Sequence, residues 1–266
     1  MDAMLSPAQL AGKLSTERGQ AAVLATFTAT LFLSALLLFS VQPMFAKMVL
    51  PKLGGSPSVW AVSTCFFQAV LLAGYCYAHL LNRFVEPRLA PLLHLVVLAI
   101  AYLALPIGLP VGASEPPTDG AYLWLIGILG AGVGLPFFAV SANAPLLQAW
   151  FARTSHPAAR DPYFLYAASN AGSFLALIAY PIAVEPFIRL GPQTWLWTSG
   201  FYLLILLIVG CGVLMLRHPG EAATQTPDAR DDPPPRWSDV AWWVFLAAVP
   251  SGLLIAVTAH IATDVA

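Results

Sequence analysis

Charged residues are scarce in this chain of 266 residues. It has 12 Lys and Arg and 13 Asp and Glu, so that only 9% of its residues are charged, against about 25% in an ordinary soluble domain. The formal net charge of -1 excludes the basic surface that attracts nucleic acid. Hydrophobic residues reach 59% and the mean hydropathy is +0.76, so a soluble fold could not bury all the apolar surface. We expect a lipid bilayer to cover much of it.

Cysteine is also rare, and its placement excludes two kinds of framework. The three cysteines are Cys65, Cys76 and Cys211, and no pair has the C-x-x-C spacing. Neither a disulfide scaffold nor a zinc site is therefore indicated, and the sequence suggests no metal and no cofactor. The chain also shows no nucleophile with an orienting base and no paired carboxylates within an uncharged stretch, so we expect no catalytic residues in it.

What the sequence does contain is long stretches without any Asp, Glu, Lys or Arg. They cover residues 21–46, 53–82, 89–114, 120–152, 162–184, 190–216 and 240–263. A helix needs about 20 apolar residues to cross the hydrocarbon core of a bilayer, and every stretch is longer than that. We therefore predict an all-α, polytopic transmembrane helix bundle with seven spans. The first stretch is too long and begins too late for a signal peptide, so we expect it to remain in the mature protein.

The positions of Lys and Arg predict the orientation. If the N-terminus is inside, the inner segments hold nine of these residues and the outer segments hold three, namely Lys47, Lys52 and Arg189. Cytoplasmic segments carry the excess of positive charge. We therefore expect a cytoplasmic N-terminus and an external C-terminus.

The charge pattern also predicts four parts of the chain. Residues 1–20 form a cytoplasmic N-terminal segment, residues 21–216 a six-helix module, residues 217–239 a cytoplasmic linker, and residues 240–266 the seventh span with the external C-terminus. The linker is rich in Pro, Asp and Arg and cannot bury an apolar face. Six spans, a linker and one more span match the first half of a major-facilitator-like fold plus one helix.

Small residues recur at four-residue spacing in several spans. Examples are Gly130 with Gly134, Gly74 with Ala78, and Gly172 with Ala168 and Ala176. Such pairs let helix backbones approach closely in lipid, and we interpret them as packing positions.

Polar residues in the fourth and fifth spans are candidates for a substrate site. The fourth span contains Pro136 and Pro145, which we expect to kink it, and broken helices often line the sites of transporters. The candidates here are Asn143, Gln148, Tyr166 and Asn170. Asn143 and Asn170 each lie eight residues from the expected inner end of their span, roughly 12 Å deep. We expect these amides to meet, either as an interhelical hydrogen-bonded pair or as part of a substrate or proton path.

The segment after the first span supplies three further candidates, Gln42, Lys47 and Lys52. We expect Pro43 and Pro51 to end regular helix there and the Gly54-Gly55 pair to form a turn with positive φ. The lysines lie where positive charge is disfavoured, so that they either bind an anionic group or lipid headgroups, or extend from the helix end toward water.

Titratable residues other than these suggest little chemistry. We interpret His79 and His94, which flank the segment between the second and third spans, as residues of the membrane interface. Glu185 is expected at headgroup level at the outer end of the fifth span.

Four stretches of the sequence resemble one family of bacterial membrane proteins, described as fused major-facilitator and spermidine-synthase proteins. They are residues 36–60, which include QPMFAKMVLPKLGGSPSVW, residues 141–154 (SANAPLLQAWFART), residues 161–173 (DPYFLYAASNAGS) and residues 257–266 (VTAHIATDVA). The resemblance implies a place in the bacterial plasma (inner) membrane. In that family the membrane part is longer and precedes a soluble aminopropyltransferase-like domain. No such domain follows in this sequence, so the resemblance transfers no synthase activity to these residues.

The resemblance leaves three hypotheses open. The chain is a transporter-like module for a small, polyamine-like solute; or it is the membrane anchor of a spermidine-synthase-like aminopropyltransferase whose catalytic domain is missing; or it is a structural module or an incomplete gene product. Expected partners are the bilayer and further transmembrane helices or a soluble synthase-like domain from another chain.

Overall fold

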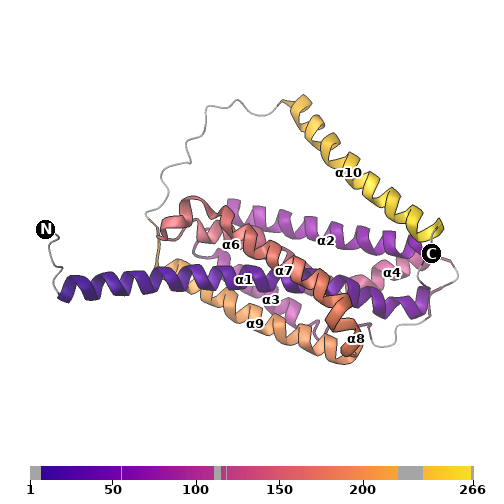
Figure 1. Ribbon diagram of the computed structural model, residues 1–266, viewed down its shortest axis with the longest axis horizontal. Helices are drawn as coiled ribbons and strands as arrows, with labels where there is room; N and C mark the ends of the chain where they lie inside the picture. The colour runs from indigo at the N-terminus through magenta and orange to yellow at the C-terminus, as the bar shows by residue number, and fades with distance from the viewer. Residues whose placement is uncertain (1–6, 55, 111–114, 118, 221–235, 265–266) are drawn as a thin grey trace.

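The computed structural model describes residues 7–54, 56–110, 115–117, 119–220 and 236–264. These residues form helices, joined by turns and irregular segments, and no strand; one isolated β-bridge links Thr154 with Pro219. The helices run back and forth side by side, except for the last one, which stands away from the others (Figure 1). The predicted all-α bundle is confirmed.

Helix α1 is much longer than the first predicted span. It runs from Pro7 to Leu53 and passes through both Pro43 and Pro51. The prediction that these prolines end the helix is wrong. A proline removes one backbone hydrogen bond, but unwinding the chain in lipid would leave several backbone groups unpaired. A continuous helix therefore has the lower free energy. Lys47 therefore lies on a helix and not in a loop.

A tight turn joins α1 to α2. Gly54 has a φ of 71° and donates its N–H to the carbonyl of Leu50 at 2.8 Å, which is a common way to end a helix. The positive φ is as predicted; Gly55 lies outside the described residues. Helix α2 spans Pro57–Phe84, with the Ser56 hydroxyl accepting a hydrogen bond from the N–H of Val59.

In the third apolar stretch the helix ends well before the last described residue, at position 110. Helix α3 spans Ala90–Tyr102, and the predicted helix over residues 89–114 is too long. Pro106 and Pro110 disfavour helix in the residues before them. Residues 103–110 instead take an irregular path, with Ile107 buried and the N–H of Gly108 facing the carbonyl of Gly132 at 3.5 Å. Irregular backbone is tolerated within a membrane where it packs against protein.

The fourth span is broken, as its prolines predict. It consists of α4 (Ala121–Leu129), the π-helical turn η1 (Gly130–Gly134), α5 (Leu135–Ser141) and α6 (Asn143–Phe151). The π-turn lies directly before Leu135-Pro136, and the second break at Ala142 lies three residues before Pro145. Prolines and π-turns are the usual causes of kinks in long helices.

The fifth and sixth spans follow a short connection. Two 3₁₀ turns, η2 (Pro157–Arg160) and η3 (Pro162–Phe164), lead into α7 (Leu165–Ala179), the π-turn η4 (Tyr180–Val184) and the short α8 (Glu185–Phe187). Helix α9 then runs over Leu190–Arg217. Most of the predicted linker 217–239 lies outside the described residues.

Helix α10 (Trp237–Asp264) slants away from the other helices of the bundle and contacts α2 (Figure 1). Its most apolar window has a mean hydropathy of 2.1, and none of that window is buried. An exposed helix that is apolar on all sides needs lipid or protein around it, in agreement with the predicted seventh span.

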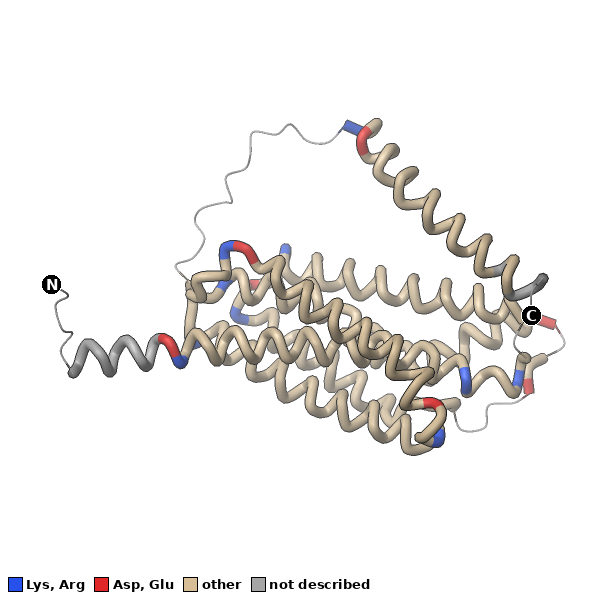
Figure 2. The backbone as a smooth tube through the Cα atoms, viewed as in Figure 1, with Lys and Arg blue, Asp and Glu red and all other residues tan. Residues whose placement is uncertain are grey.

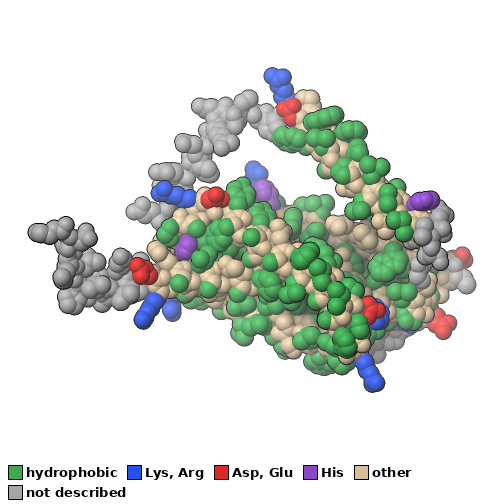
Figure 3. All heavy atoms as spheres, viewed as in Figure 1, with side chains coloured by type: hydrophobic (Ala, Val, Ile, Leu, Met, Phe, Trp, Pro, Cys, Tyr) green, Lys and Arg blue, Asp and Glu red, His purple; other side chains and the backbone are tan. Residues whose placement is uncertain are grey.

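The charged residues gather near the two ends of the bundle, and the helices between them are almost free of charge (Figure 2). Hydrophobic side chains spread over the visible face between these ends (Figure 3). Six helices of the described part are long and apolar enough to cross a membrane, and α3 is a shorter apolar helix. The chain is a multi-pass membrane protein. We call the end at which α1 finishes the Lys47 end, and the end at which α6 finishes the Arg153 end.

Small residues let α1 pack closely against α7, its most extensive helix contact. A Cβ atom added to Gly172 would collide with the carbonyl oxygen of Phe32, and one added to Gly74 would collide with the Ser141 hydroxyl. The packing interpretation holds for both glycines. It is wrong for Gly130, where an added Cβ would contact no described residue of another helix within 4 Å.

Candidate functional site

A pocket of about 480 Å³ opens near the Lys47 end between α1, α2 and the segment from α7 to α8. Its volume lies within the range of about 300–1,000 Å³ typical of small-molecule sites. Helix α1 contributes Gln42 and Lys47, α2 contributes Ser63 and Thr64, and α8 contributes Glu185. The remaining lining is apolar or aromatic. An apolar pocket with a few polar groups is the usual form of a ligand site.

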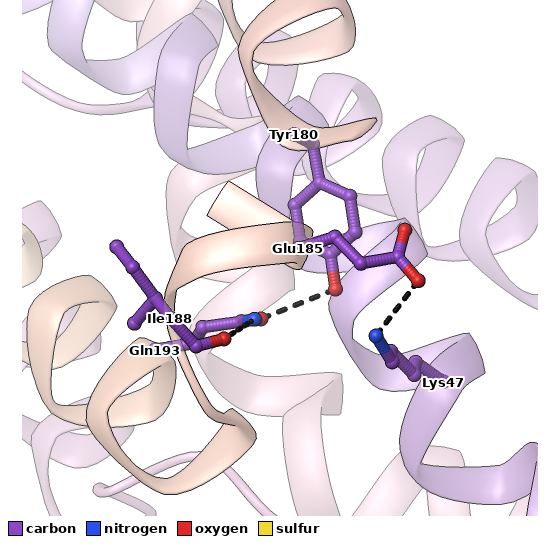
Figure 4. Close-up of polar contacts among 5 residues, drawn as sticks. All are labelled: Lys47, Tyr180, Glu185, Ile188 and Gln193. Atoms are coloured by element: carbon purple, nitrogen blue, oxygen red, sulfur yellow. Dashed lines mark hydrogen bonds and ion pairs between the residues drawn. The ribbon is translucent and has the colours of Figure 1, made fainter. Parts of the chain in front are cut away.

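An ion pair crosses one side of the pocket. The Lys47 Nζ donates to the Glu185 Oε1 at 2.7 Å (Figure 4), and the two side chains are 37% and 44% exposed. Partly exposed pairs of this kind contribute only about 0–1 kcal/mol. A cationic ligand could therefore replace Lys47 at the carboxylate with little loss of stability.

Hydrogen bonds to Gln193 of α9 hold the segment that carries Glu185, although Gln193 itself does not line the pocket. The Tyr180 hydroxyl donates to the Gln193 Oε1 at 3.1 Å, and the Gln193 Nε2 donates to the carbonyl of Ile188 at 2.7 Å (Figure 4). Gln193 is only 3% exposed. One buried amide thus holds both the Tyr180 ring and the turn after Glu185 in place.

Four aromatic side chains line the pocket, namely Phe39, Trp60, Phe67 and Tyr180. The faces of aromatic rings attract cations, by about 0.5–2 kcal/mol each when the geometry is good. Together with the Glu185 carboxylate, these rings suit an organic ammonium group with aliphatic carbons attached. Lys47 gives the same pocket one cation that can hold an anionic group.

The structure brings together only two of the predicted site residues, Gln42 and Lys47. Lys52 is half-buried near the end of α1, outside the pocket lining. Gln148 is half-buried on α6, and Tyr166 is exposed at the start of α7, with its ring stacked on that of Tyr163 at 6.0 Å between centroids.

The predicted meeting of Asn143 and Asn170 is wrong. Asn143 is 1% exposed and bonds to His94, whose Nε2 lies 2.8 Å from the Asn143 Oδ1, while Asn170 is exposed on α7. Asn170 precedes Gly172 by two residues, which is about 200° around a helix. Because Gly172 packs on α1, Asn170 must point away from the bundle.

The prediction for His94 is wrong as well. This histidine is 1% exposed and lies inside the bundle, not at the interface. Its Nδ1 lies 3.4 Å from the Tyr77 hydroxyl, and Asn143 continues the chain of hydrogen bonds to Ser34 at 3.0 Å. We call Ser34, Tyr77, His94 and Asn143 the His94 network.

Comparison of the chain with protein-family models, curated proteins and solved structures finds no match. The geometry of the pocket and of the His94 network must therefore carry the functional argument.

Sequence reasoning missed Glu185 as a site residue. It treated the carboxylate as an ordinary headgroup-level residue, although Lys47 was expected at the same end of the spans. The available signal was that Lys47 and Glu185, which carry opposite charges, were both expected at the outer ends of the spans and could therefore pair. The aromatic lining could not be found in this way, because the spans contain many aromatic residues with no mark to distinguish those that face a pocket.

Proposed function

We propose that this membrane protein is a transporter-like module that binds a small organic amine, polyamine-like in its chemistry, in the pocket at the Lys47 end. The observation that carries the proposal is that the Glu185 carboxylate lines a pocket of about 480 Å³ together with four aromatic side chains. A carboxylate next to aromatic faces binds an ammonium group and tolerates the methylene groups beside it.

Two further features support a transport role. The fourth span is interrupted twice and the fifth contains a π-turn directly before Glu185, and interrupted helices are common near the sites of transporters. The resemblance of four stretches to fused major-facilitator and spermidine-synthase proteins points to the same class of solute.

Uptake by proteoliposomes tests the proposal. Vesicles containing the purified protein should accumulate labelled spermidine or putrescine above protein-free vesicles. Glu185→Gln should reduce uptake by about tenfold or more, because it removes a charge-assisted bond of about 1.5–3 kcal/mol. Glu115→Gln is the matched control: Glu115 is exposed and does not line the pocket, so its uptake should equal that of the wild type.

The alternative role as a synthase anchor makes a different prediction in the same material. If the protein accumulates neither amine but restores aminopropyl transfer when a soluble synthase-like partner is added, the anchor role is correct and the transport proposal fails.

We further propose that the Arg153 end faces the cytoplasm of a bacterial cell and the Lys47 end the outside. A reporter enzyme fused after Thr226 should then be active as a cytoplasmic protein, and one fused after Ala266 as an external protein. The reverse pair of activities would overturn the orientation.

A further inference from the structure

The His94 network joins four helices inside the bundle. Ser34 lies on α1, Tyr77 on α2 and His94 on α3, while Asn143 is the first residue of α6, directly after the second break of the fourth span. Ser34 and Asn143 are 4% and 1% exposed. Ionisable residues within membrane spans are rare and usually have a function.

In each hydrogen bond of the network, the donor and the acceptor can be assigned in only one way when His94 is neutral. The Ser34 hydroxyl donates to the carbonyl of Val140 at 3.4 Å, so its oxygen accepts from the Asn143 Nδ2. The Asn143 Oδ1 then faces the His94 Nε2 at 2.8 Å, and this nitrogen must carry a hydrogen. The His94 Nδ1 is left as an acceptor, with the Tyr77 hydroxyl as its donor at 3.4 Å.

This arrangement leaves one place for an additional proton, on the Nδ1 of His94. A hydroxyl hydrogen can rotate, so Tyr77 can change from donor to acceptor when Nδ1 gains a proton. The bonds from His94 to Asn143 and from Asn143 to Ser34 need not change. The proton comes from water, and no other group changes its covalent state.

Among the residues that the structure describes, those that face His94 carry no negative charge. Asn143 and Trp150 of α6 face it, the Trp150 ring at 6.2 Å between centroids, and Tyr77 faces it from α2. The buried thiol on the adjacent α9, Cys211, is bonded to Thr30 of α1. None of these groups is a carboxylate. An imidazolium without a counter-ion is unstable in a packed interior.

We propose that His94 is a proton-binding site that couples protonation to the position of α6. The neutral ring holds Asn143, and through it the break at Ala142, against α3 and α1. The protonated ring favours an arrangement in which α3 and α6 separate enough for water to reach His94. The proposal goes beyond the binding of an amine at the Lys47 end, and it stands even if uptake of amines fails.

Nitrogen NMR of the protein in lipid bilayers, with ¹⁵N-labelled histidine, tests the proposal directly. The His94 signal is assigned by its absence from His94→Gln. It should show the neutral Nε2–H form near neutral pH and convert to the doubly protonated form as the pH falls from about 8 to about 4, an interval that extends below the range of about pH 5–8 in which an unperturbed histidine changes charge. A ring that stays neutral throughout this range would overturn the proposal.

Two further variants keep His94 and are expected to shift the pH of its conversion in opposite directions. This test does not depend on the folding of His94→Gln. Asn143→Asp supplies a counter-ion and should move the conversion to higher pH by about 1–3 pH units. Tyr77→Phe removes the acceptor for the new proton and should move it to lower pH. Shifts in the same direction, or no shift in either variant, would contradict the assignment.

Thermal unfolding provides the readout of the coupling. The midpoint should fall as the pH is lowered, because protonation disfavours the packed bundle, and His94→Gln should reduce this dependence. His79→Gln is the control, because His79 is exposed on α2, and it should keep the wild-type profile. An undiminished pH dependence in His94→Gln would overturn the coupling.

Discussion

Replacement of Asn143 by leucine is expected to remove a large part of the stability of the bundle. Leucine leaves the His94 Nε2–H without an acceptor and Ser34 without a donor, both in a buried environment. An unsatisfied buried polar group costs about 1–3 kcal/mol, and a whole domain is stable by only about 5–15 kcal/mol. The midpoint of thermal unfolding in detergent, followed by intrinsic fluorescence, measures the loss.

Asn170→Leu is the matched control for this substitution. The same side-chain change occurs on α7, but Asn170 is exposed, and leucine is favoured over an amide next to lipid. Its midpoint should equal or exceed that of the wild type. A normal midpoint for Asn143→Leu, or equal losses in both variants, would show that the His94 network does not hold the helices together.

A single methyl group at Gly172 is expected to have the second large effect. The added carbon of Gly172→Ala would collide with the backbone carbonyl of Phe32 and lie 3.3 Å from the Cβ of Ala35. Backbone atoms cannot rotate aside, so α7 must move away from α1. Overpacking of this kind costs about 1–3 kcal/mol, and the midpoint of thermal unfolding should fall accordingly.

Gly130→Ala provides the comparison at a position with open space. In the described part of the chain, no atom outside the adjacent residues and the neighbouring backbone of its own helix lies within 4 Å of the added Cβ, and alanine has the higher helix propensity. We expect an unchanged or slightly higher midpoint. If both alanine variants lose stability equally, close contact between α1 and α7 is not the cause.

The sequence predicted the number of apolar segments and the gathering of charge at the ends of the bundle, since both follow directly from the position of charged residues. Proline was a less reliable guide. Pro136 and Pro145 mark breaks in the fourth span, whereas α1 continues through Pro43. Whether a proline ends a helix in lipid depends on what the unwound backbone would contact, and that is a property of the tertiary structure.

The failed pairing of Asn143 with Asn170 shows a limit of depth arguments. Equal distance from a helix end places two residues at one level, but contact also depends on the direction in which each faces. The close approach of Gly172 to Phe32 turns Asn170 away from the bundle. Asn143 instead meets His94, a residue that sequence reasoning placed at the membrane surface because it follows a short charged segment.

The same limit applies to the candidate site. Gln42 and Lys47 were chosen from one segment, and both line the pocket. The carboxylate that completes the site is 138 residues further along the chain. Its partnership with Lys47 depends on α1 continuing beyond Pro43, which the sequence did not predict.

The most direct test of the amine site is equilibrium binding of labelled spermidine to the purified protein in detergent, with Lys47 and Glu185 varied separately. If the pocket binds an ammonium group at Glu185, Glu185→Gln loses binding, and Lys47→Gln binds more tightly than the wild type because the ligand no longer competes with Lys47 for the carboxylate. Equal binding by the wild type and both variants, or no binding by a folded wild-type protein, would contradict the proposed site.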